Sequence, residues 1–144
     1  MKRERRRRSA AARCVLDSGG LTALIGRSQQ ARAWFRWIIE HDGPVLVPTP
    51  ILVETTTGDG ARDAEVNRIL SVLASIEGAF VQPDEKIARA AGRCRHRAKT
   101  DDGIDALVAA TAAVGGTPCI LLTSDPDDMR RLLVGDPGVT IVDV

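Results

Sequence analysis

Residues 119–133 read CILLTSDPDDMRRLL, and the fold prediction starts from this stretch. The apolar run at residues 119–122 is typical of a buried strand. Asp125 precedes Pro126, and an acidic residue before a first-turn proline indicates the start of a helix, here at residues 126–133. The apolar run at residues 139–142 predicts the next strand. The C-terminal part is therefore predicted to be strand, helix, strand.

The same alternation extends back to the beginning of the chain. Further strands are predicted at residues 13–16, 45–47 and 79–81. Helices are predicted at residues 21–25, 28–41, 50–57, 59–76, 83–99 and 104–114. Because parallel neighbours need crossover connections, strands separated by helices indicate a mostly parallel sheet covered on both faces. The expected fold class is α/β, with three α/β/α layers.

Composition favours a single folded domain over residues 13–144. Of the 144 residues, 44% are hydrophobic and 27% are charged, which is ordinary for a soluble globular protein. The aromatic fraction of 3% nearly excludes a nucleic-acid platform of stacked aromatic rings. No apolar stretch is long enough for a membrane helix and no signal peptide is visible, so we expect a cytoplasmic protein without membrane contact.

Charge is distributed unevenly along the chain. The first eight residues, MKRERRRR, hold six of the 20 basic residues and one of the 19 acidic residues, a net charge of +5. The remaining 136 residues carry a net charge of −4. Residues 1–12 are therefore predicted to form a basic, disordered arm. This arm is either a solvated tail, the result of a start site placed too far upstream, or a contact for nucleic acid phosphates.

Four acidic residues are predicted to lie near the carboxyl ends of the strands, where open parallel sheets form their functional crevice. Asp17 and Asp125 directly follow two of the predicted strands. Glu54 lies on the helix after a third strand, and Asp105 lies in the first turn of a helix. Each residue alone also has an ordinary structural interpretation, as a helix cap, a first-turn acid or a surface glutamate. Their joint placement favours a shared site.

Four segments of the sequence resemble PIN-domain ribonucleases, and VapC-type toxins in particular. They are VLDSGGL at 15–21, VPTPILVET at 47–55, GIDALVAATA at 103–112 and LTSDPDDMRRL at 122–132. Their order and spacing fit from about residue 13 to the C-terminus, and the last two segments are the most specific. The resemblance implies that the functional acids are Asp17, Glu54, Asp105 and Asp125, the same four that the topology selects.

Carboxylates placed close together repel one another and favour the binding of a cation. Oxygen ligands without His or Cys select Mg²⁺, with Mn²⁺ as a possible substitute, over zinc. We expect Asp17 and Asp105 to be the principal ligands and Asp125 to bind directly or through water. Glu54 is expected to orient water or to hold a second ion. The ion would activate water for in-line attack on an RNA phosphodiester, leaving 5′-phosphate and 3′-hydroxyl ends.

Neighbouring positions leave alternatives open. Many sequences of this type have a hydroxyl residue two positions after the first acid, where this chain has Gly19. That hydroxyl group is either missing or supplied by Ser18. Asp127 is an alternative or additional fourth acid, and Thr123 and Ser124 are expected to help orient Asp125.

Two further surfaces are candidates for partners. Basic side chains either hold RNA phosphates or form a solvated face; they are Arg89, Arg93, Arg95, Arg97 and Lys99 on one helix, with Arg130 and Arg131. The resemblance also implies a homodimer and a VapB-type antitoxin that lies in an apolar groove and blocks the acidic site. Trp34, Trp37 and Ile38 are candidates for that groove or for a dimer contact, and Trp34 is equally suited to the core.

Other classes of protein lack their signatures in this chain. A phosphatase of the haloacid-dehalogenase type needs D-x-D, but Gly19 replaces the second acid, and a receiver domain needs a lysine near the last strand. The G-x-G-x-x-G and G-x-x-x-x-G-K-[ST] motifs are absent, and His41 and His96 have no plausible Ser or Cys partner. The cysteines are too scattered for a disulfide framework or a zinc site. The remaining alternative is a catalytically silent PIN-like module that binds RNA or an antitoxin.

Overall fold

Strand β4 (Cys119–Thr123) is buried along its whole length, because it lies between two other strands of a parallel sheet that helices cover on both faces. The computed structural model describes residues 11–144. Residues 1–10 of the predicted basic arm lie outside the described residues. The other strands are β1 (Arg13–Leu16), β2 (Val45–Pro48), β3 (Phe80–Val81) and β5 (Val139–Asp143). All neighbouring strands are parallel, in the order β3-β2-β1-β4-β5.

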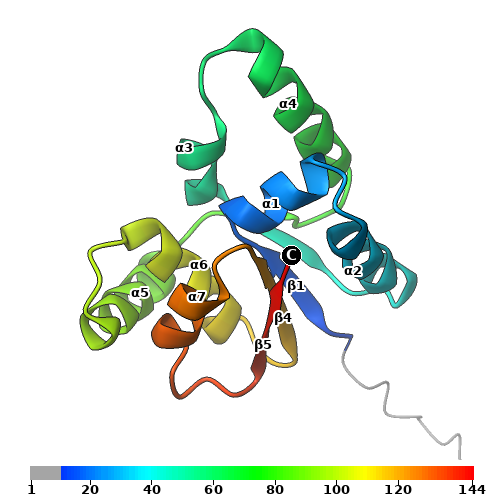
Figure 1. Ribbon diagram of the computed structural model, residues 1–144. Helices are drawn as coiled ribbons and strands as arrows, with labels where there is room; N and C mark the ends of the chain where they lie inside the picture. The colour runs from blue at the N-terminus through cyan, green and yellow to red at the C-terminus, as the bar shows by residue number, and fades with distance from the viewer. Residues whose placement is uncertain (1–10) are drawn as a thin grey trace, which may run out of the picture.

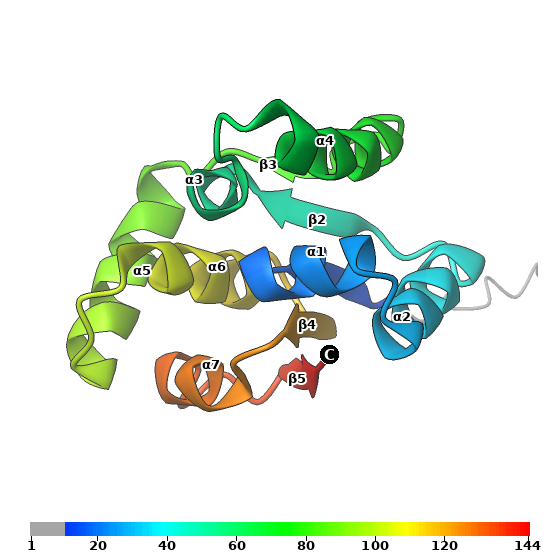
Figure 2. The ribbon, with the colours of Figure 1, turned by 45° about the horizontal axis from the view of Figure 1, so that its top comes forward.

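Helices cover both faces of this sheet. They are α1 (Ser18–Ile25), α2 (Gln29–Glu40), α3 (Leu52–Thr55), α4 (Gly60–Ala74), α5 (Glu85–Ala98), α6 (Gly103–Val114) and α7 (Pro126–Leu132), with a 3₁₀ turn η1 (Thr49–Ile51) before α3. Helices α2, α3 and α4 each contact α1, whereas α5, α6 and α7 contact one another on the other side of the sheet (Figures 1 and 2). The predicted three-layer α/β/α fold is confirmed. Within residues 11–144, no helix is long and apolar enough to cross a membrane.

The strand order reverses beside β1. The chain first places β2 and β3 to one side of β1, and it later returns to place β4 on the other side. Helices on the two faces diverge at such a reversal, which leaves a crevice at the carboxyl ends of the strands. The carboxyl ends of β1 and β4 therefore mark the place where this fold is expected to form a site.

The core is built from aliphatic side chains, as the small number of aromatic residues requires. The largest fully buried side chains include Leu16, Leu21, Ile38, Leu121, Leu122 and Met129. The three cysteines are also buried and form no disulfide. Burial raises the pKa of the Cys14 thiol to about 12, so this group stays protonated and behaves as an apolar core residue.

Two helices differ from their predicted extents. Helix α1 begins at Ser18 rather than at residue 21, because the Asp17 carboxylate accepts a hydrogen bond of 2.6 Å from the Gly20 N–H and closes the first turn. The helix predicted at residues 50–57 is instead the turn η1 followed by the short α3, which stops where Thr56 adopts an extended backbone. Both differences arise from local features, a cap hydrogen bond and a backbone conformation, that apolar periodicity does not report.

Gly20 allows α1 to approach β4 closely. A Cβ atom at this position would collide with the backbone carbonyl of Leu122, whereas a Cβ at Gly92 on α5 would meet only open space. We predict that Gly20→Ala lowers the free energy of unfolding by about 1–3 kcal/mol, because backbone has to move to relieve the clash. Gly92→Ala is the control and should raise it by up to ~1 kcal/mol. Chemical denaturation measures both, and equal effects of the two substitutions would contradict the close packing.

Candidate active site

Asp17 is the most deeply placed of the four acidic residues. It directly follows β1, is 4% exposed, and caps α1 through its hydrogen bond from Gly20. Burial raises the pKa of Asp17, and the charge of Glu54 raises it further, while hydrogen bonds from Thr123 and Gly20 act in the opposite direction. Asp17 therefore caps α1 as predicted, and its carboxyl group is also close enough to Glu54 for that charge to raise its pKa.

Thr123 joins two of the acidic residues. It is fully buried at the end of β4, and its hydroxyl oxygen accepts a hydrogen bond of 2.9 Å from the backbone N–H of Asp125. The same hydroxyl group hydrogen-bonds to the Asp17 carboxyl group. Thr123 thus holds the backbone of Asp125 and the side chain of Asp17 in a fixed relation, which is a larger role than its expected help in orienting Asp125.

Asp105 lies in the first turn of α6 and is half-buried. The N-cap residue Asp102 accepts a hydrogen bond of 2.9 Å from the Asp105 N–H. Burial raises the pKa of Asp105 to about 6, and the neighbouring negative charges of Asp102, Asp17, Glu54 and Asp125 contribute to the increase. The electrostatic environment of Asp105 therefore includes each of the other three predicted site residues.

Glu54 and Asp125 complete the acidic group from opposite sides of β1. Glu54 is exposed on the short helix α3 that follows β2. Asp125 is exposed and caps the N-terminus of α7, where its carboxylate accepts a long hydrogen bond of 3.4 Å from the Asp128 N–H. The fold thus brings all four predicted acids to one edge of the sheet. Within residues 11–144, no three Asp, Glu, His or Cys side chains converge closely enough to hold one ion as they stand.

Two neighbouring residues bear on the alternatives that the sequence leaves open. Asp127, considered as an additional acid, is exposed and forms an ion pair of 2.6 Å with Arg130, so its charge is already matched. The Ser124 side chain packs against Gly19 so tightly that a Cβ atom on Gly19 would overlap it. A hydroxyl group from Ser124, which is distant in sequence, therefore lies beside Gly19.

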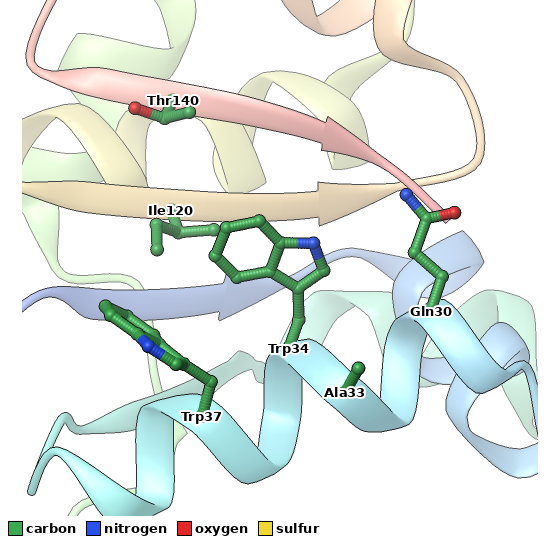
Figure 3. Close-up of a pocket in the computed structure, with 6 residues that line it drawn as sticks. All are labelled: Gln30, Ala33, Trp34, Trp37, Ile120 and Thr140. Carbon is green, nitrogen blue, oxygen red and sulfur yellow. The ribbon is translucent and has the colours of Figure 1, made fainter.

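An apolar groove lies between α2 and the strands β4 and β5, away from the acidic residues. It has a volume of about 590 Å³ and is lined by Gln30, Ala33, Trp34, Trp37, Ile120 and Thr140 (Figure 3). The two tryptophan rings meet edge to face at 5.9 Å, and Trp37 remains 42% exposed. Ile38 is fully buried in the core, so its proposed place in a groove or dimer contact is wrong. Neighbouring positions on a helix point in different directions, so Ile38 faces the core while Trp37 lines the groove.

Comparison with known proteins identifies the family of this fold. Residues 14–132 match the family model of the PIN domain. No curated protein sequence matches the chain significantly.

Several solved structures resemble this chain along almost its entire length. The DNA-bound VapBC complex from Salmonella typhimurium has a TM-score of 0.67 and 19% identity, covering 92% of this chain and 98% of that one. A toxin-antitoxin complex from Klebsiella pneumoniae has a TM-score of 0.65 and 19% identity, covering 91% and 99%. VapBC2 from Rickettsia felis, bound to a DNA fragment from its promoter, has a TM-score of 0.69 and 13% identity, covering 91% and 98%. At these identities the likeness establishes a shared fold.

The raised pKa of Asp105 predicts a pH-dependent effect of neutralising it. Because its pKa rises from 3.8 to about 6 on folding, the folded state holds more protons between these values, and stability falls as the pH rises through them. Asp105→Asn should therefore raise the free energy of unfolding by about 1 kcal/mol at pH 7.5, a value reduced because the half-exposed carboxyl is screened by water. The gain should disappear near pH 4.

Asp101→Asn, on the exposed loop just before α6, is the control for this measurement. Thermal or urea unfolding at both pH values measures the difference between each variant and the wild type. A gain for Asp105→Asn that is equally large at pH 4 would contradict the electrostatic origin.

Proposed function

Because the chain belongs to the PIN domain family, we propose that it is a divalent-metal-dependent endoribonuclease, the toxin of a VapBC-like toxin–antitoxin pair. The observation that carries this proposal is the placement of four carboxylates at the carboxyl edge of the sheet. Burial raises the pKa of Asp105, and the charges of Asp102, Asp17, Glu54 and Asp125 raise it further. Within residues 11–144, none of these four carboxylates forms a salt bridge. Such mutual repulsion is unfavourable unless a cation binds.

The donor groups fit a hard divalent cation. All four are carboxylates, and the cysteines are buried elsewhere in the core, so the set favours Mg²⁺ or Mn²⁺ over zinc. Within residues 11–144 the carboxyl oxygens do not converge on one point, so an ion would have to draw them together on binding. We therefore assign Asp17 and Asp105 as the principal ligands, with Asp125 binding directly or through water. Such an ion, when bound, lowers the pKa of water and stabilises negative charge at a phosphodiester.

The residues of the chain position the reactants. Asp17 keeps its orientation through Gly20 and Thr123, and Asp125 keeps its backbone position through Thr123. Glu54, an exposed member of the group, orients the attacking water. Attack forms a bond from the water oxygen to phosphorus and breaks the bond from phosphorus to O3′. A proton passes to O3′, which leaves a 3′-hydroxyl and a 5′-phosphate.

The proposal includes a protein partner. The solved complexes that share this fold carry the names of toxin–antitoxin pairs, so we propose a VapB-type antitoxin that blocks the acidic edge, and a homodimer of the toxin. The apolar groove of Trp34 and Trp37 supports a protein contact, because exposed tryptophan is concentrated at interfaces.

Cleavage of RNA tests the proposed function. Purified protein with Mg²⁺ or Mn²⁺ should cut end-labelled cellular RNA and leave 5′-phosphate ends, and EDTA should abolish the cutting. Asp17→Asn should reduce the rate by at least about 100-fold, because it removes a charge that holds the cation. Asp127→Asn is the matched control and should keep nearly full activity, since Asp127 is exposed and paired with Arg130.

Equal activity of the wild type and Asp17→Asn would indicate a contaminating nuclease. If both proteins are inactive on varied RNAs in either metal, the nuclease proposal fails, and a catalytically silent module that binds RNA or an antitoxin takes its place.

Metal binding has a separate readout in stability. An ion that binds only the folded state stabilises it according to RT ln(1 + [L]/Kd), about 2.7 kcal/mol at 100 times Kd. Saturating Mg²⁺ or Mn²⁺ should therefore raise the melting temperature of the wild type and of Asp127→Asn. It should leave that of Asp17→Asn/Asp105→Asn nearly unchanged. A shift of equal size in this double variant would place the ion elsewhere.

A further inference from the structure

Helix α5 concentrates positive charge in a domain that is acidic overall. Fourteen basic residues follow the first eight residues of the chain, and six of them lie on α5 or at its C-cap. These six are Lys86, Arg89, Arg93, Arg95, Arg97 and Lys99. The helix contains one acidic residue, Glu85. A cluster of this kind is the electrostatic footprint of a protein that binds a polyanion.

Two of these six side chains have structural partners. Arg89 pairs with Glu85 at 2.8 Å, on the surface of the helix. Arg97 was expected to point outward, but its guanidinium donates to the Leu132 carbonyl at 3.0 Å and lies 3.8 Å from Asp136, so it ties α5 to the end of α7. The other four form no salt bridge within residues 11–144; they are Lys86, Arg93, Arg95 and Lys99.

Arg95 and Lys99 face one surface hollow at the C-terminal end of α5. Lys99 adopts a left-handed backbone with φ of 53°, and the Thr100 N–H donates to the Arg95 carbonyl at 3.2 Å, so the chain folds back on the helix. The hollow has a volume of about 420 Å³ and is lined by Arg95, His96, Lys99, Thr100 and Asp101. Asp101 is the single acidic side chain in this lining.

The hollow adjoins the candidate active site. Thr100 lines it and also lines a second, smaller hollow, whose other walls include Asp102 and Asp105. A chain that leaves Asp105 along this surface therefore passes Thr100 and reaches Arg95 and Lys99. Positive side chains at this position would offset the repulsion that four carboxylates exert on an incoming polyanion.

The helix dipole gives only a partial account of these charges. Basic residues in a last turn offset the partial negative charge of a helix C-terminus, and Arg95 and Lys99 have that effect here. The carbonyls of Arg95 and His96 already accept hydrogen bonds from Thr100 and Lys99, at 3.2 and 3.3 Å. Lys86 and Arg93 lie outside the last turn, so the dipole does not explain them.

We propose that Arg95 and Lys99 bind backbone phosphates of the RNA strand that crosses the acidic site, with the strand passing from Asp105 over Thr100 into this hollow. The inference rests on the proposed function, because it takes RNA as the substrate of that site. Contacts of this kind hold and orient the strand without reading its sequence.

Binding of RNA in EDTA tests the inference without cleavage. Fluorescence anisotropy of a labelled single-stranded RNA should show binding by the full-length wild type. Arg95→Gln/Lys99→Gln should weaken binding about tenfold near physiological salt, and should reduce the slope of log K against log salt by about 1.4, the value for two phosphate contacts on a single strand. Arg95→Lys/Lys99→Arg keeps both charges and should bind nearly as the wild type does.

The matched control is Arg62→Gln/Arg68→Gln, which removes two exposed charges from α4 on the other face of the sheet. It should change the affinity by less than about twofold, and thermal melting should show that every variant is folded. An equal loss in this control, an unchanged affinity of Arg95→Gln/Lys99→Gln, or no binding by the wild type would overturn the inference.

Cleavage by the wild type in Mg²⁺ separates this inference from the proposed function. If the wild type cuts RNA but its affinity does not depend on Arg95 and Lys99, the hollow is not a phosphate site and the nuclease proposal stands. If affinity depends on these residues but no RNA is cut, the phosphate site stands and the nuclease proposal fails.

Discussion

Repulsion among like charges is the constraint on which the carboxyl edge of this sheet depends. Asp17 follows β1, Asp125 follows β4, and helices α3 and α6 add Glu54 and Asp105 to the same edge. An ordinary globular protein gains no stability from such a group, because each carboxylate raises the cost of ionising the others. Burial is the main cause of the raised pKa values of Asp17 and Asp105, and repulsion from neighbouring carboxylates adds to it.

The fold tolerates this cost through hydrogen bonds that fix the acids individually. The Gly20 N–H and the buried Thr123 hydroxyl group hold Asp17, and Thr123 also holds the backbone of Asp125. The residue that donates the first of these bonds, Gly20, is also where α1 approaches β4 closely. Packing in the core and chemistry at the edge therefore share residues, so the site is part of the framework rather than an addition to it.

The sequence predicts the succession of elements well, because buried strands and amphipathic helices leave strong apolar periodicities. It also predicts which acids reach the edge, since topology brings the ends of parallel strands together. Contacts between distant segments are what it does not show. The Ser124 side chain against Gly19, the Arg97 link to Leu132 and the pairing of Asp127 with Arg130 all depend on side-chain directions. Ile38 was misassigned for the same reason, because a shift of one position on α2 separates groove from core.

The placement of the tryptophans gives this protein a built-in optical probe. The chain contains two tryptophans and no tyrosine, so Trp34 and Trp37 dominate its ultraviolet emission. Both line the same groove between α2 and the strands β4 and β5, and Trp37 also stacks on His41 with ring centroids 4.4 Å apart. Fluorescence from the unlabelled protein therefore reports the state of one surface. An occupant of the groove changes the wavelength and intensity of that emission, while events at the acidic edge leave the indole surroundings largely as they are.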